Sequence, residues 1–250
     1  MNILGLFVVV PVLMILFLFL CKDIKSIRAV MVTGATALLA LTAVLVVTFL
    51  RERAKNISFI SETACPDAEM LLVQSWTWYA PLNITMTLGV DGISVMMIAL
   101  SSIIVFTGVF SSWNMDMAKE FFLWYCLLTI GVFGFFITID LFSMFMFYEV
   151  ALIPMYLLIG LWGTGKKEYS AMKLTLMLMG GSAFLMIGII GIFFASGATT
   201  FNIVDIANSV RIPIEHQRWI FPVTFLGFGV LGALFPFHTW SPDGHASAPT

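Results

Sequence analysis

The chain has 250 residues, of which 60% are apolar and only 10% are charged, and its formal net charge is −2. An average soluble domain carries about 25% charged residues to cover its surface, so this composition excludes a soluble enzyme and a disordered chain. The near-neutral charge excludes the basic surface of a nucleic-acid-binding protein. A polytopic membrane protein is the class that remains.

Seven apolar runs are long enough to cross a membrane, which takes about 20 residues of helix. The first run lacks the basic segment and the cleavage site of a signal peptide, so we expect it to stay in the protein. The sequence therefore predicts an all-α fold of about seven transmembrane helices. They are Ile3–Leu20, Ala29–Leu50, Ile93–Trp113, Phe121–Ile139, Leu141–Leu161, Leu174–Ala195 and Trp219–Phe235.

Two longer connections interrupt these runs. Arg51–Asp91 contains alternating apolar and polar residues with Thr, Trp and Tyr, which predicts a short hairpin at the membrane interface. Ser196–Arg218 has apolar residues near helical spacing between Phe201 and Ala207, which predicts an amphipathic surface helix. We expect both connections on the same side of the membrane.

The distribution of Lys and Arg predicts the orientation. The short connections after the first, third and fifth predicted helices hold seven basic residues, and the longer connections on the opposite side hold five. The positive-inside rule counts short loops. We therefore expect the seven-residue side in the cytoplasm, and the N-terminus and the hairpin outside.

Glu149 is the carboxylate that lies well inside a predicted span. It sits about 12 Å from the outer end of its helix, at a rise of 1.5 Å per residue. A charge at that depth is costly unless it is protonated, paired or hydrated, and burial favours the neutral form. We predict that Glu149 handles protons; the alternative is a protonated side chain that only hydrogen-bonds a neighbouring helix.

The C-terminal segment holds the densest polar cluster, with His238, Asp243 and His245. Pro236, Pro242 and neighbouring glycine interrupt a regular helix there, so we expect the last transmembrane helix to be broken. The two histidines are candidates for proton relay. A metal site is disfavoured because no third ligand has suitable spacing and the three cysteines lie far apart. The alternative is a re-entrant loop with capping side chains.

Lys173 opens the sixth predicted helix. It is either an interfacial lysine that reaches toward water or a member of a buried charge chain. Glu149 lies about 18 Å from the cytoplasmic end of its helix, so direct pairing between the two is not expected and waters would have to bridge them.

Three segments resemble the antiporter-like subunits of respiratory complex I, above all those of the subunit M type (mitochondrial subunit 4). Phe147–Trp162 resembles the fifth-helix signature of this family, and Val90–Ser94 resembles the start of its third helix. Phe237–His245 with Ala248–Thr250 is similar to its broken seventh helix. The matching segments are spread over about two thirds of the chain.

The resemblance implies a fold of two inverted five-helix repeats within about fourteen helices. The chain, 1–250, would form a single transmembrane domain containing the first repeat and flanking helices, without the second repeat. We therefore expect either a fragment or a split subunit completed by another chain. The resemblance also implies partners of the L and N types in a membrane arm. This chain would bind no cofactor, while other subunits hold FMN, iron–sulfur clusters and quinone.

The sequence departs from the family at one position. The family usually places a lysine seven residues before the first histidine of the broken helix, where this chain has Leu231. The resemblance implies that this lysine pairs with the family's fifth-helix glutamate, a proton-handling residue that matches Glu149. The pair is therefore missing at its usual place, and Lys173 is the nearest candidate to replace the lysine.

These observations lead to a proton-translocating membrane subunit of an NADH:quinone oxidoreductase, with no redox chemistry in the chain itself. A subunit of a cation/proton antiporter or of a membrane-bound hydrogenase is the alternative, and a structural scaffold that no longer pumps is the third hypothesis. We expect a bacterial or archaeal cell membrane rather than the mitochondrial inner membrane.

Overall fold

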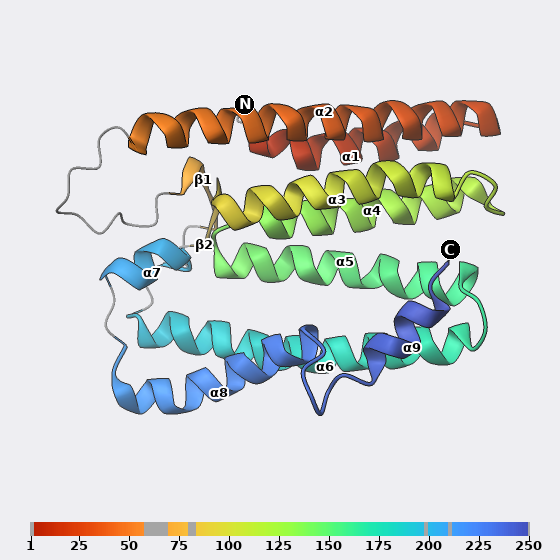
Figure 1. The fold of residues 1–250 in the computed structure, drawn as a ribbon. Coiled ribbons are helices and arrows are strands. Elements are labelled where there is room, and N and C mark those ends of the chain that lie inside the picture. The colour runs from red at the N-terminus through yellow and green to blue at the C-terminus, as the bar shows by residue number, and fades with distance from the viewer. Residues whose placement is uncertain (1–2, 58–69, 80–83, 198–199, 210–211, 250) are drawn as a thin grey trace. The chain divides into compact units, whose positions relative to one another are not determined.

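A computed structural model describes residues 3–57, 70–79, 84–197, 200–209 and 212–249. The chain divides into two compact units, and the single transmembrane domain stays a prediction. The first unit comprises Met1–Trp76 and Thr87–Ile139, and the second comprises Thr77–Met86 and Asp140–Thr250. Figure 1 shows the helices and strands of both units.

The first unit consists mainly of four helices, α1 (Ile3–Leu20), α2 (Ile24–Ile57), α3 (Gly92–Ser111) and α4 (Ala118–Ile137). Long-range hydrogen bonds hold the turns at one end together. Lys119 Nζ donates to the carbonyls of Phe19 and Cys21, and Arg28 donates to the carbonyl of Trp113 at 2.7 Å. Basic residues from the first and third connections therefore gather at one end of this unit. This is expected if successive predicted helices cross the membrane in alternating directions.

A hairpin of β1 (Leu71–Tyr79) and β2 (Ile84–Val90) forms a two-stranded sheet. Most side chains of β1 are exposed, whereas β2 is buried over its second half. The predicted hairpin is therefore present. α2 continues to Ile57 into the segment predicted as a connection.

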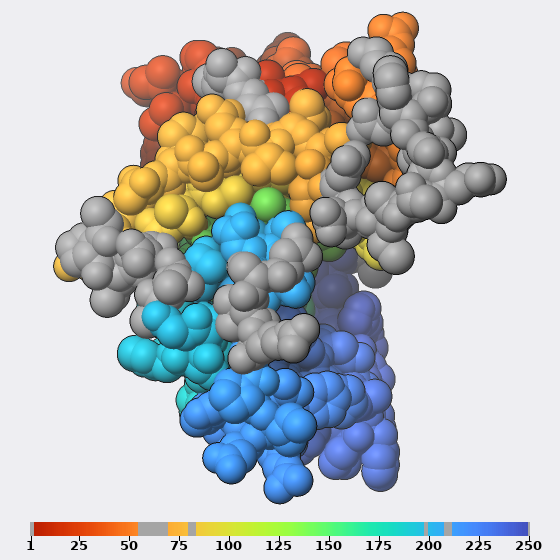
Figure 2. Space-filling view, turned by 90° about the vertical axis from the view of Figure 1, so that its left-hand side faces the viewer, coloured from red at the N-terminus to blue at the C-terminus, as the bar shows by residue number. Residues whose placement is uncertain are grey.

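The second unit contains five helices, α5 (Leu141–Trp162), α6 (Lys167–Ala195), α7 (Ile203–Ser209), α8 (Ile214–Leu231) and α9 (Trp240–Ser247). The end of α6, α7 and the start of α8 lie at the same end of this unit (Figures 1 and 2). α7 falls where the amphipathic helix was predicted. α9 packs on α6, and Ser247 Oγ donates to Ser170 Oγ at 2.8 Å.

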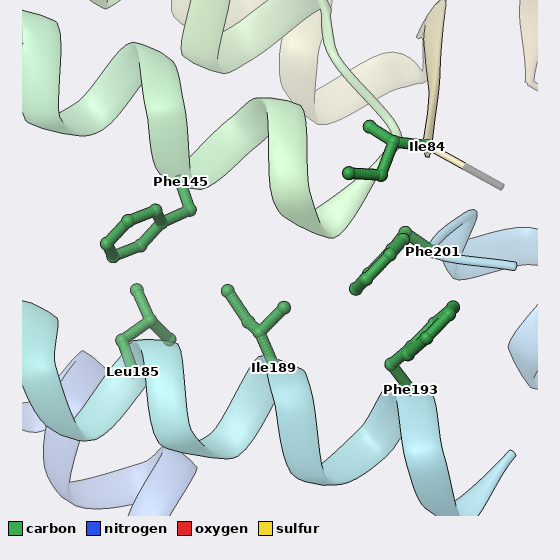
Figure 3. Packing of buried hydrophobic residues seen from close by; sticks show 6 residues of the cluster. All are labelled: Ile84, Phe145, Leu185, Ile189, Phe193 and Phe201. Atoms are coloured by element: carbon green, nitrogen blue, oxygen red, sulfur yellow. The ribbon is translucent and has the colours of Figure 1, made fainter. Parts of the chain in front are cut away.

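One core of this unit is built mainly of aromatic and branched side chains. Phe193 and Phe201 stack with ring centroids 4.0 Å apart. Figure 3 shows how side chains from outside α6 face those of α6 in this cluster. Its buried members are Ile84, Phe145, Leu185, Ile189, Phe193 and Phe201. The core fixes the first half of α5 against α6.

Glycines allow α8 to approach α6 closely. A Cβ on Gly227 would lie 2.7 Å from the Leu185 amide nitrogen, and one on Gly181 would lie 2.8 Å from the Val230 side chain. Small residues at helix crossings permit such approach within membranes. The crossing holds the last turns of α8 against the middle of α6.

The predicted break in the last helix is present, and its hydrogen bonds explain where it falls. Leu234 N donates to Gly229 O at 2.7 Å and Ala233 N donates to Val230 O at 3.2 Å, the two bonds of a Schellman motif. Ala233 takes the left-handed conformation that ends the helix, with φ 52°. α8 therefore stops at Leu231, four residues before the predicted end.

Six of the described helices, α1 to α6, are long and apolar enough to cross a membrane. α8 corresponds to the seventh predicted span but is not among them. It begins earlier than predicted, at Ile214, and so includes the polar residues Glu215, His216 and Arg218. The chain is an integral multi-pass membrane protein of the all-α class.

Candidate functional site

Glu149 lies in the interior of α5. It is eight residues from the start of the helix, about 12 Å along its axis. Its side-chain atom Oε1 is buried and makes no hydrogen bond to the described residues. A buried carboxyl oxygen without a partner is rare in folded proteins, which nearly always give such an atom a hydrogen bond. The proton-binding role of Glu149 stays a prediction.

Lys173 pairs with Asp243 of α9. Its Nζ atom lies 2.7 Å from Asp243 Oδ2, and the two side chains are 22% and 43% exposed. The ammonium group also lies 5.7 Å from the centroid of the Tyr169 ring, within the range of a cation–π contact. Lys173 therefore has a carboxylate partner within the broken-helix segment, on a different element from Glu149.

The residues around Asp243 attach α9 to the start of α6. The Ser247 carbonyl accepts a hydrogen bond from Thr164 N at 3.0 Å, while the Ser247 hydroxyl bonds Ser170. Gly244 is buried, and a Cβ there would lie 2.7 Å from the Leu174 side chain. These contacts place Asp243 beside Lys173.

The two histidines of the predicted relay are both exposed. His245 Nδ1 donates to the Ser241 carbonyl at 2.6 Å, and the His238 ring lies 5.6 Å from the Phe235 ring. Among the residues that the structure describes, no three His, Cys, Asp or Glu side chains gather closely enough to hold a metal ion. Both histidines make local contacts within the broken-helix segment, and a relay role stays a prediction.

Leu231 occupies the position where the resemblance led us to expect a lysine. It is the last residue of α8 and is partly buried. Its side chain packs against the aromatic core and against a second apolar cluster, which includes Leu152, Leu174 and Trp240. The position is therefore apolar in its surroundings as well as in its side chain.

Asp140 is a buried carboxylate that the sequence did not predict as a site residue. It is 0% exposed and caps the start of α5, accepting a hydrogen bond from Ser143 N at 2.9 Å on its Oδ1 atom. Its other oxygen, Oδ2, makes no hydrogen bond to the described residues. The Asp-x-x-Ser spacing predicts the cap, but the sequence holds no signal that this acid is fully buried.

Six helices that are long and apolar enough to cross a membrane, followed by a broken helix, define a polytopic membrane protein. Residues 138–250 match the family described as NADH:quinone oxidoreductase/Mrp antiporter, TM. This part of the chain belongs to that family, which the resemblance anticipated.

Two relatives agree with this assignment. The chain is 32% identical over 181 residues to the NAD(P)H-quinone oxidoreductase chain 4-2 of Synechocystis sp., covering 71% of this chain and 32% of that protein. It is 36% identical over 186 residues to the NADH-quinone oxidoreductase subunit M of Pseudomonas aeruginosa, covering 69% of this chain and 36% of that one. The matched regions thus span about a third of these relatives.

The fold is similar to a chain of respiratory complex I from Thermus thermophilus with bound NADH. The TM-score is 0.79 at 23% identity, over 98% of this chain and 47% of that chain. At this identity the likeness shows a shared fold.

Proposed function

We propose that the chain is a proton-translocating, antiporter-like membrane subunit of an NADH:quinone oxidoreductase. The observation that carries the proposal is the buried, unpartnered Oε1 of Glu149 within the membrane-spanning helix α5. The family match over the same helix supports it, as do the two relatives named as quinone oxidoreductase subunits.

In this proposal Glu149 binds a proton as a neutral acid and releases it as a carboxylate. The Lys173–Asp243 pair lies on the route between Glu149 and water, because its exposed carboxylate and ammonium can exchange protons with solvent. His238 and His245 are further relay candidates. Electron transfer takes place in other subunits, which hold FMN, iron–sulfur clusters and quinone, and no electron passes through this chain.

Further proposals concern the setting. The chain assembles with other membrane-arm subunits of the L and N types in the lipid bilayer of a bacterial or archaeal cell. Its N-terminus and hairpin lie outside. The gathering of basic residues at one end of the first unit supports this orientation.

Glu149→Gln tests the proposal. Glutamine is nearly isosteric but cannot ionise, so we expect normal assembly and a fall in proton pumping of about a hundredfold or more, the usual scale for removing a positioned acid or base. Donor oxidation should slow with pumping, and Glu149→Asp should be intermediate. The measurement is proton uptake by reconstituted vesicles containing the native assembly, beside donor oxidation.

The exposed Glu168 of α6 supplies the matched control, since Glu168→Gln removes a carboxylate outside the buried site. We expect this variant to pump at the wild-type rate. Wild-type pumping by Glu149→Gln would instead make Glu149 a structural hydrogen-bonding residue, and the proposal would be wrong.

Two other functions have specific support. The family description names Mrp antiporters beside the quinone oxidoreductases, which supports a subunit of a cation/proton antiporter or of a related membrane-bound hydrogenase. The apolar surroundings of Leu231 support a scaffold that no longer pumps. The Glu149 variants distinguish the scaffold from both transport functions.

A further inference from the structure

Unpartnered buried oxygen atoms concentrate on one helix. In the part of the chain that the structure describes, five buried side-chain nitrogen or oxygen atoms have no hydrogen-bond partner. Three of them belong to α5 and its capping residue: Asp140 Oδ2, Ser143 Oγ and Glu149 Oε1. Two of these three lie at the same first turn of the helix.

Helix capping accounts for only part of Asp140. The cap uses Oδ1, which accepts from Ser143 N, and leaves Oδ2 buried without a partner. Asp140 is 0% exposed and Ser143 is 2% exposed, so bulk water does not reach either side chain. Native proteins almost always satisfy such groups, with an ordered water or with a proton.

The chain offers an internal comparison. Asp91 caps α3 in the same Asp-x-x-Ser arrangement, accepting from Ser94 N at 2.7 Å. Asp91 and Ser94 are only partly buried. Because the cap alone is compatible with partial exposure, the full burial of Asp140 needs a different explanation.

We propose that Asp140 is a second proton-binding residue of this subunit and that its Oδ2 atom and the Ser143 hydroxyl hold a water molecule at the start of α5. The proposal rests on the proton-transport function proposed above. Asp140 precedes Glu149 by nine residues, about 13 Å along the helix, so further waters must carry protons between them.

The proton step needs no electron transfer. A hydronium ion on the aqueous side gives a proton to the water held beside Ser143 and becomes a neutral water. The held water passes a proton to Asp140 Oδ2, which forms an O–H bond, and is itself left as a neutral water. The carboxylic acid then returns this proton to the water held beside Ser143, which passes it on. Burial raises the pKa of the Asp140 carboxyl above its ordinary value, and this rise is partly offset by the Ser143 amide and hydroxyl and by the Phe142 amide, which lie close to the carboxylate.

Asp140→Asn separates capping from proton binding. Asparagine caps a helix about as well as aspartate but cannot exchange a proton. In the native assembly, we expect Asp140→Asn to lower proton pumping several-fold and to remove a protonated-carboxyl C=O band from the infrared difference spectrum. Asp91→Asn, the matched cap on α3, should change neither.

The outcomes distinguish this inference from the proposed function. Wild-type pumping by Asp140→Asn, with pumping lost in Glu149→Gln, would overturn the role of Asp140 alone. Wild-type pumping in both variants would overturn both. Should Asp140→Asn fail to assemble, Ser143→Ala decides, because it keeps the carboxyl and the amide donor. It should pump several-fold more slowly, and an unchanged rate would contradict the water site.

Discussion

The Lys173–Asp243 pair shows how exposure limits the contribution of a single contact. Ion pairs with partly exposed side chains contribute about 0.2–1 kcal/mol to stability, because water screens the charges. Because its side chains are 22% and 43% exposed, this pair stabilises the contact between α6 and α9 only weakly. Ser170, Ser247 and Gly244 hold α9 independently. The pair is therefore not required to hold α9 on α6, and its place in proton exchange stays a prediction.

We expect Lys173→Met and Asp243→Asn to lower proton pumping by similar factors, since either change breaks the same pair. The temperature of unfolding should change little in each, because water screens a partly exposed ion pair. Vesicle proton uptake and thermal unfolding in detergent measure the two effects. Lys167→Met is the control, because Lys167 donates only to the Leu161 carbonyl among the contacts described. Undiminished pumping by Lys173→Met would remove Lys173 from the route.

At this scale the sequence predicted Glu149 because a single acid within an apolar run stands out. It did not predict the partner of Lys173, which lies 70 residues away. Asp140 was missed for a similar reason. Asp140 forms an isolated β-bridge with Asn202, which is distant in sequence. Hydrophobic periodicity does not show which distant segments come together to bury a residue. The roles of all these residues stay predictions.

Helices are the elements that the sequence predicted best, since apolar runs of sufficient length give the approximate bounds of α1 to α6, although the seventh predicted span corresponds to α8, which is not among the helices apolar enough to cross a membrane. α1 begins and ends as predicted, at Ile3 and Leu20. The bounds of α2 and α8 differ, because polar residues continue a helix beyond the hydrocarbon without interrupting it. The end of α8 depends on backbone bonds formed by Ala233 and Leu234, which hydropathy does not register.

The crossing of α6 and α8 gives a prediction from two nearby glycines. Gly227→Ala should destabilise the protein by about 1–3 kcal/mol, because its Cβ would overlap the backbone of α6 at Leu185. Gly229→Ala is the matched control in the same helix. Its Cβ meets only the Leu234 side chain, at 3.4 Å, so the better helix propensity of alanine should make it neutral or stabilising by up to about 1 kcal/mol.

Thermal unfolding of both variants in the same detergent checks this prediction. Equal midpoints for Gly227→Ala and Gly229→Ala would show that α6 and α8 do not depend on close approach at Leu185.

The whole molecule raises the question of its assembly, because the matched regions span about a third of the relatives' lengths. We expect the native assembly, purified through this chain, to contain flavin and iron–sulfur subunits and to oxidise NADH. A cation/proton antiporter would instead yield small antiporter subunits alone. Optical spectra of flavin and iron–sulfur clusters, with NADH oxidation, distinguish the two outcomes.

Composition alone predicted the class of the molecule, since a chain with 10% charged residues cannot cover a soluble surface. It did not predict the division into two units. That division depends on which helices pack together, and all of the predicted spans have similar apolar composition.

The end of α8 has a consequence for where water is needed in the second unit. When a helix is interrupted within hydrocarbon, the last peptide carbonyls lose their helical hydrogen bonds and need another donor. Here the carbonyls of Phe228, Gly229 and Val230 accept bonds from the following residues, and the Trp240 indole also donates to Val230 at 3.0 Å. The carbonyls of these three peptides are therefore hydrogen-bonded within the protein. Water that enters nearby is not needed as a hydrogen-bond donor to these three carbonyls. It therefore remains available to hydrogen-bond the carboxylates of this unit.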